Sequence, residues 1–151
     1  MDPSWAPVDH GGTCLLGVWM SNGAVYRQAV EEAMELLAGS WAVAVLAALA
    51  PRRLQYSVLL GAINDAEQRA GWVAHQRPLS EKVLSQTLTR MQRDGLITRH
   101  RESEFPPVTW YQITPLGRSL LAALRPLAEW SLSHRDELGV ARDRRRSARQ
   151  A

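Results

Sequence analysis

Apolar residues recur at helical spacing along several segments of the chain. The pattern is clearest where Leu84, Leu88 and Met91 form one apolar stripe between Ser80 and Gly95, two residues of the types that begin and end helices. The segment 41–49 is apolar on nearly every side, which is typical of a helix inside a core. The pattern therefore predicts helices over residues 25–38, 41–49, 57–66, 80–94 and 115–138.

Turn and capping residues separate these helices. Serine and threonine at an N-cap accept a hydrogen bond from a helix amide, whereas glycine or proline ends a helix. We expect such roles for Gly39, Ser40, Pro51, Ser57, Ser80, Gly95, Thr114 and Gly139, whereas Pro115 is expected at the first position of the last helix, where its missing N–H costs nothing. Pro126 lies inside the last pattern and is expected to kink that helix.

Two β-rich stretches, Leu96–Arg101 and Val108–Ile113, flank a polar segment with two prolines. This arrangement indicates a hairpin with a stiffened tip. A single hairpin is not stable alone in water, so it must pack on the helices. The order of elements predicts a mainly α fold with a small β-hairpin wing, the layout of a winged helix-turn-helix domain.

The composition fits one compact domain with tails. The chain has 151 residues, of which 46% are hydrophobic, and its longest apolar run ends at Pro51. Because a bilayer span needs roughly 18 apolar residues, we expect no membrane helix. No basic segment leads into an apolar stretch at the N-terminus, and there is a single cysteine, Cys14. These features favour a cytoplasmic protein without a secretion signal or disulfides.

Three regions are expected along the chain. Residues 1–22 are read as an irregular extension, residues 23–139 as the folded domain, and residues 140–151 as a basic disordered tail. The formal charge of the chain is +3, and the tail holds five arginines against one aspartate between Arg142 and Arg149. The folded part is therefore near neutral, and the overall charge by itself does not indicate a nucleic-acid partner.

The polar face of the helix at 80–94 is the strongest candidate for chemistry. Its side chains lie opposite the apolar stripe, and Glu81 and Asp94 at its two ends are the carboxylates beside it. A helix fits the DNA major groove, where Gln and Arg pair with base edges. Helix amides at Ser80 can bind a phosphate. The expected DNA contacts are Ser80, Lys82, Ser85, Gln86, Thr89, Arg90 and Arg93 on this helix, Arg99 and Arg101 on the wing, and Arg77 before the helix.

Other interpretations of this face stay open. Any surface helix is polar opposite its buried stripe, and a winged-helix module that binds protein would look the same. No cluster of residues typical of an enzyme, a cofactor or a metal site stands out, because the four histidines are scattered and do not have ligand spacing. We therefore expect no enzyme activity, no cofactor and no metal.

Several short motifs in order resemble one family, the HxlR-type winged helix-turn-helix regulators related to the MarR group. The matching stretches are residues 33–41 (AMELLAGSW), 82–88 (KVLSQTL), 94–97 (DGLI), 105–107 (FPP) and 111–117 (YQITPLG). The resemblance covers about two-thirds of the chain. It implies a homodimer formed through the first and last helices, a recognition helix at Ser80–Asp94, a wing at Ile97–Ile113, double-stranded DNA as partner, and repression as the sense of regulation.

The chain departs from that family at three places. Gln28 and Ala29 stand where many members have Cys-Pro, which puts thiol sensing in doubt, and Ser40 stands where a lysine is common. The segment Asn64–Pro78 is longer than the family's usual short turn. We interpret it as a second DNA-contacting element, a wall of a ligand pocket, or a loop pinned to the core by Trp72.

Aromatic side chains give a candidate site for a small-molecule effector. Such sites favour interfaces between a domain and its dimerisation helices, whereas core packing is the ordinary use of these rings. The candidates are Trp41, Tyr56, Trp72, Trp110 and Trp130.

Overall fold

The computed structural model describes residues 23–71, 75, 77–103 and 105–150. The expected extension at 1–22 and Trp72 lie outside the described residues. By internal contacts the chain divides into two units, residues 1–38 and residues 39–151. Each unit is considered separately.

In the first unit the structure describes one helix, α2 (Gly23–Leu36). It corresponds to the helix expected over 25–38, shifted by two residues toward the N-terminus. None of its side chains is buried, and Val25, Val30 and Met34 are 62%, 41% and 57% exposed. A 14-residue helix with exposed apolar side chains is marginal alone in water, so it needs a partner surface.

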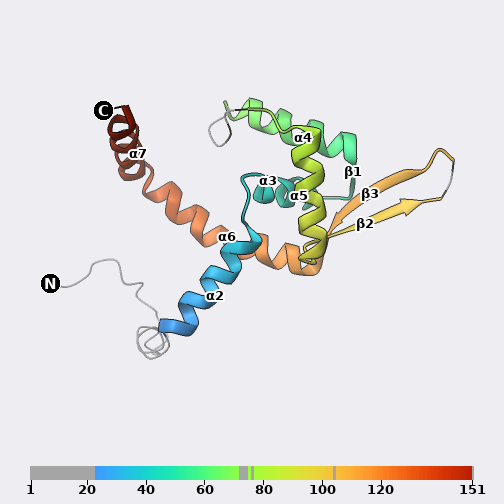
Figure 1. The fold of residues 1–151 in the computed structure, drawn as a ribbon, viewed down its shortest axis with the longest axis horizontal. Coiled ribbons are helices and arrows are strands. Elements are labelled where there is room, and N and C mark those ends of the chain that lie inside the picture. Colours follow the sequence, from blue (N-terminus) through green and yellow to red (C-terminus); the bar gives the residue numbers. More distant parts are fainter. Residues whose placement is uncertain (1–22, 72–74, 76, 104, 151) are drawn as a thin grey trace. The chain divides into compact units, whose positions relative to one another are not determined.

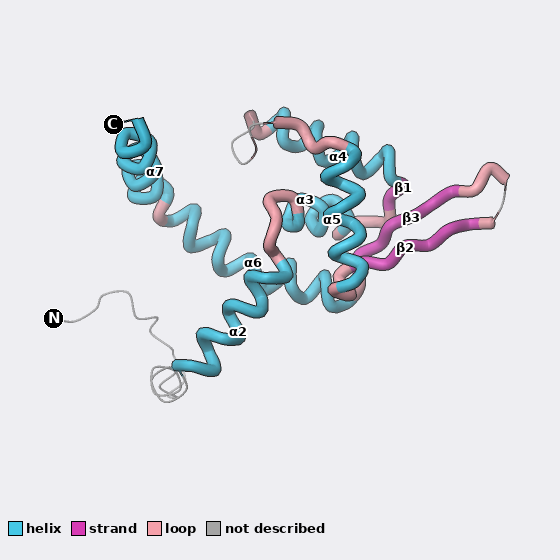
Figure 2. Tube along the Cα trace, in the orientation of Figure 1, coloured by secondary structure: helices cyan, strands magenta, loops and turns pink. Residues whose placement is uncertain are grey.

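In the second unit, three helices and a sheet surround one core (Figures 1 and 2). The helices are α3 (Ala42–Leu49), α4 (Tyr56–Arg69) and α5 (Glu81–Arg93). The apolar faces expected from the periodicity meet there. The fully buried side chains are Val45, Leu46, Leu49, Leu59, Leu84, Leu88, Met91, Leu96 and Ile97.

The hairpin is part of a three-stranded antiparallel sheet of order β1-β3-β2. The expected wing strands are β2 (Ile97–Glu102) and β3 (Val108–Ile113), paired from Ile97↔Ile113 to Glu102↔Val108. A short strand that the sequence does not announce, β1 (Leu54–Gln55), pairs with β3 through Leu54↔Tyr111. Figure 2 shows β1 beside the base of the hairpin, which projects away from the helices. The predicted winged-helix fold is confirmed.

Two expected N-caps are confirmed. The Ser80 hydroxyl accepts a hydrogen bond from the Val83 amide at 3.3 Å. The Thr114 hydroxyl accepts one from the Gly117 amide at 3.0 Å and itself donates toward the Gly95 and Leu96 carbonyls. The Thr114 bonds hold the beginning of the helix that follows β3 against the turn that ends α5.

Two other expected N-caps are wrong. Helix α3 has Trp41 at its N-cap and no side-chain cap, so Ser40 does not cap it. Helix α4 starts at Tyr56, which places Ser57 in the first turn. For α4, the reason is the pairing of Gln55 with Trp110, because this strand contact sets where the chain can turn into α4.

The C-terminal part is more helical than expected. Helix α6 (Pro115–Ser133) continues through Pro126, and α7 (Arg135–Gln150) follows after His134. A glycine inside a helix costs only about 1 kcal/mol relative to alanine, which the alanine, glutamate and arginine around Gly139 offset. The break between the helices lies at His134 instead of Gly139, and residues 140–150 of the basic tail, which was expected to be disordered, are helical. No helix in the described part of the chain has the length and apolar character for crossing a bilayer.

Candidate nucleic-acid interface

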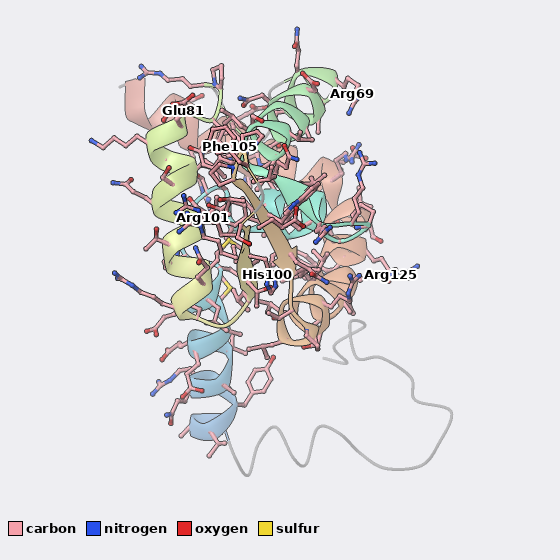
Figure 3. The ribbon with its side chains drawn as sticks, turned by 90° about the vertical axis from the view of Figure 1, so that its right-hand side faces the viewer. Arg69, Glu81, His100, Arg101, Phe105 and Arg125 are labelled. Carbon is pink, nitrogen blue, oxygen red and sulfur yellow. The ribbon has the colours of Figure 1, made fainter. Side chains whose placement is uncertain are left out.

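The stripe on α5 decides which side of that helix faces outward. Leu84, Leu88 and Met91 are at most 1% exposed and anchor α5 on the core. The opposite side therefore points to solvent. Figure 3 shows the α5 side chains projecting away from the body, with Glu81 at the start of the helix.

Nine of the ten expected DNA-contacting residues are exposed in the structure. On and beside α5 these are Arg77, Ser80, Lys82, Ser85, Gln86, Thr89 and Arg93, and on β2 they are Arg99 and Arg101. Arg99 and Arg101 are two positions apart on one strand, so they lie on one face of the wing. The helix and the wing are joined by a short turn at Gly95, whose φ is +72°. A polar helix face and a basic strand face thus belong to one continuous segment of chain.

Arg90 differs from the other nine because it is half-buried. An added Cβ on Gly39 would lie 2.9 Å from both terminal nitrogens of the Arg90 guanidinium, so the guanidinium packs on that glycine. Its Nε and Nη2 are buried and have no hydrogen-bond partner among the described residues. The expectation that Arg90 projects outward like Gln86 does not match this arrangement. Gly39, with φ of +105°, provides the space because it has no side chain.

Tyr56 connects α4 to α5. Its hydroxyl donates to the Glu81 carbonyl at 2.7 Å and lies 3.0 Å from the Ser85 hydroxyl. The Thr89 hydroxyl in turn donates to the Ser85 carbonyl at 2.9 Å. The sequence suggested a ligand-binding role for Tyr56 but not this one, since no local pattern reports a contact across 25 or more residues.

The base of the wing is held by an arginine that the sequence analysis did not single out. The Arg53 guanidinium lies 4.5 Å from the centroid of the Trp110 ring and 3.4 Å from a Glu102 carboxylate oxygen. Both contacts join the segment before β1 to the hairpin. At the tip, Phe105 is 96% exposed (Figure 3).

The long segment before α5 is fixed by His75. Its ring stacks on Trp41 with centroids 3.5 Å apart, Nδ1 lies 3.1 Å from a Glu67 carboxylate oxygen, and Nε2 lies 2.5 Å from the Ser40 carbonyl oxygen. The His75 side chain is 11% exposed, so it is packed instead of presented to DNA. The end of the segment is held where the Asn64 side chain forms two hydrogen bonds with the Leu79 backbone.

The candidate effector-binding rings have different neighbours. Trp41 is buried under His75, Tyr56 faces Tyr111, and Trp110 lies under Arg53, whereas Trp130 is 51% exposed and stacks on His134. No ring contact joins any two of these four candidates in the part of the chain that the structure describes. This placement gives no support for a shared effector site. The described residues also hold no cluster of three or more His, Cys, Asp or Glu side chains suited to a metal.

Comparison with known proteins agrees with the fold. Residues 36–138 match the family model for the HxlR-like helix-turn-helix. The chain is 30% identical over 117 residues to an HTH-type transcriptional regulator of Methanothermobacter thermautotrophicus, covering 76% of this chain and 79% of that protein. Among solved structures it resembles a MarR-family regulator of Enterococcus faecalis (TM-score 0.60, 23% identity, 75% of this chain, 91% of that chain). It also resembles the transcriptional regulator YtfH of Salmonella typhimurium (TM-score 0.53, 25% identity, 76% and 90%).

Proposed function

Since this chain belongs to the HxlR-like helix-turn-helix family and is by membership a DNA-binding transcriptional regulator, we propose that it acts as a homodimeric, sequence-specific repressor that reads DNA with α5. The observation that carries the proposal is the exposed face of α5, which presents Lys82, Gln86 and Arg93 above a fully buried stripe. A helix presented in this way fits the major groove.

The proposed contacts divide by chemistry. Gln86 pairs with a base edge, and Lys82 and Arg93 bind bases or phosphates. The amides at Ser80 bind a phosphate, helped by the helix dipole. Arg99 and Arg101 on the wing and Arg77 before α5 bind the flanking backbone. We expect less from Arg90, because its guanidinium must first leave Gly39.

We propose residues 23–139 as the functional domain, and we propose that the dimer contact is made by α2 and α6. Helix α2 exposes Val25, Val30 and Met34. Helix α6 exposes Leu127 and Trp130, at 55% and 51%. Apolar surfaces of this kind on a monomer are typical of protein interfaces. A second copy of the chain covers them in the proposed assembly.

The dimer is the first prediction. Sedimentation equilibrium at micromolar concentration is expected to give twice the 16.9 kDa chain mass. Leu127→Lys is expected to shift the protein toward monomer, because burying an unpaired charge at an apolar contact is costly. Ser119→Lys, at an exposed polar position of the same helix, is the control. A wild-type protein that stays monomeric while bound to its operator would refute the two-fold model, which requires half-sites about 34–36 Å apart.

Gln86→Ala tests the reading face. We expect it to weaken binding to the promoter of its own gene by about 1–3 kcal/mol, roughly five- to 150-fold, because a bidentate base contact is lost. Fluorescence anisotropy with a labelled duplex measures the change, and a reporter on the same promoter should be derepressed by the same variant.

Gln68→Ala is the matched control, since Gln68 is an exposed glutamine on α4. It is expected to bind and repress as the wild type does. If Gln86→Ala also leaves affinity unaltered, α5 is not the reading helix. If the wild type shows no sequence-dependent binding at all, a protein-binding role for the winged helix replaces the proposal.

A further inference from the structure

The hydrogen bonds of Tyr56 determine which group its hydroxyl can still serve. A tyrosine hydroxyl has one proton, and a backbone carbonyl can only accept. The Tyr56 oxygen lies 2.7 Å from the Glu81 carbonyl oxygen, so the proton of Tyr56 is in that bond. Tyr56 is therefore an acceptor in its second contact.

That second contact is with Ser85, at 3.0 Å between the two hydroxyl oxygens. Because the proton of Tyr56 is already engaged, the proton in this bond comes from Ser85. Ser85 is an exposed residue of α5, and a hydroxyl oxygen that donates its proton still has lone pairs to accept with. As the structure presents it, Ser85 offers an incoming ligand an acceptor and no donor.

The Thr89 hydroxyl on the same face also has its proton engaged and can only accept from a ligand. Thr89 lies four residues after Ser85, one helical turn further along α5, and its proton is donated to the Ser85 carbonyl at 2.9 Å. Two exposed hydroxyls in succession thus present lone pairs, beside the donor-only ammonium group of Lys82.

The major groove contains few groups that can donate to such an acceptor. Phosphate oxygens, guanine N7 and O6 and thymine O4 only accept, whereas adenine N6 and cytosine N4 carry amino protons. We propose that Tyr56 makes Ser85 selective for a base with an amino group, adenine or cytosine, on the strand that faces it. This inference rests on the proposed function, and it makes Tyr56 a positioning residue that acts through Ser85.

The test is a base-by-base profile of the operator. Each position of one half-site is changed to all four bases, and binding is measured for the wild type, Ser85→Ala and Tyr56→Phe. The wild type should prefer adenine or cytosine at one position, and Ser85→Ala should remove that preference alone. Tyr56→Phe frees the Ser85 proton, so guanine or thymine there should become about three- to tenfold less unfavourable, the range for one net hydrogen bond.

Ser57→Ala is the control, because Ser57 is an exposed serine beside Tyr56 on α4. Its profile should equal that of the wild type. If Tyr56→Phe does not fold, the Ser85→Ala profile decides alone. The inference is overturned if a folded Tyr56→Phe has the base profile of the wild type. It is also overturned if the position sensitive to Ser85→Ala prefers guanine or thymine, if Ser85→Ala weakens all sequences equally, as a phosphate contact would, or if Ser85→Ala changes nothing. In each of these cases the wild type still binds its operator selectively, whereas failure of the proposed function would abolish that selectivity.

Discussion

Replacing Leu88 by alanine is expected to lower the free energy of unfolding by about 2–5 kcal/mol. Leu88 is 1% exposed, on the stripe that holds α5 on the core. Removing its side chain loses the transfer free energy of the missing carbons and leaves a cavity between Leu84 and Met91, which are fully buried. Urea unfolding should show a lower midpoint with an unchanged slope, since the exposed surface on unfolding is nearly the same.

Val83→Ala is the control on the same helix. Val83 is 37% exposed, and alanine has the higher helix propensity, so the expected change is within about 0.5 kcal/mol. Both variants are compared at one protein concentration, because the stability of the proposed dimer would depend on it. Equal losses in the two variants would contradict the assignment of inner and outer faces on α5. Below its unfolding transition, Leu88→Ala should bind the operator nearly as well as the wild type.

Gly117→Ala is expected to destabilise the protein by about 1–3 kcal/mol or more, although it adds a single methyl group. A Cβ at this buried position would lie 2.3 Å from the Leu96 carbonyl oxygen and 2.9 Å from Ile113 Cγ1. The Leu96 oxygen cannot easily move, because it accepts hydrogen bonds from the Thr114 amide and hydroxyl, both at 3.0 Å. The start of α6 would have to move away from Leu96, the residue that precedes wing strand β2. Thermal unfolding measured by circular dichroism reports the loss.

Gly61→Ala is the opposite case in the same fold. Gly61 lies inside α4, and an added Cβ there meets nothing within 4 Å. The substitution should stabilise the protein by about 0.5–1 kcal/mol, because glycine loses more backbone entropy in a helix than alanine does. If Gly117→Ala unfolds at the wild-type temperature, the close approach of α6 to Leu96 is wrong.

Local features of the sequence predicted the elements well where the signal was itself local. The stripe of α5, the Ser80 and Thr114 caps and the two wing strands follow from spacing and residue type within a few positions. The wrong cap at Ser57 depends on a strand contact between Gln55 and Trp110 across more than fifty residues of chain. Capping propensity cannot anticipate a contact of that kind.

The candidate reading face was predictable for the same reason. A helix with one buried side must expose the other, so Lys82, Gln86 and Arg93 could be placed from periodicity. Arg90 was not, because its direction depends on the space beside Gly39, which belongs to another part of the fold. For the segment before α5, one of three interpretations was a loop pinned by Trp72, which lies outside the described residues. Among the described residues, His75 makes a contact with Trp41.

The sequence by itself determined which helix is amphipathic, where its caps lie and which residue types it offers to solvent, because each of these depends on neighbours within one or two turns. Only the tertiary structure decided how those groups are presented. It turned the guanidinium of Arg90 back onto Gly39, and it placed the Tyr56 hydroxyl where Ser85 must give up its proton. The direction of a long side chain and the polarity of a hydroxyl are set by the atoms packed around them, and folding brings those atoms from distant parts of the chain.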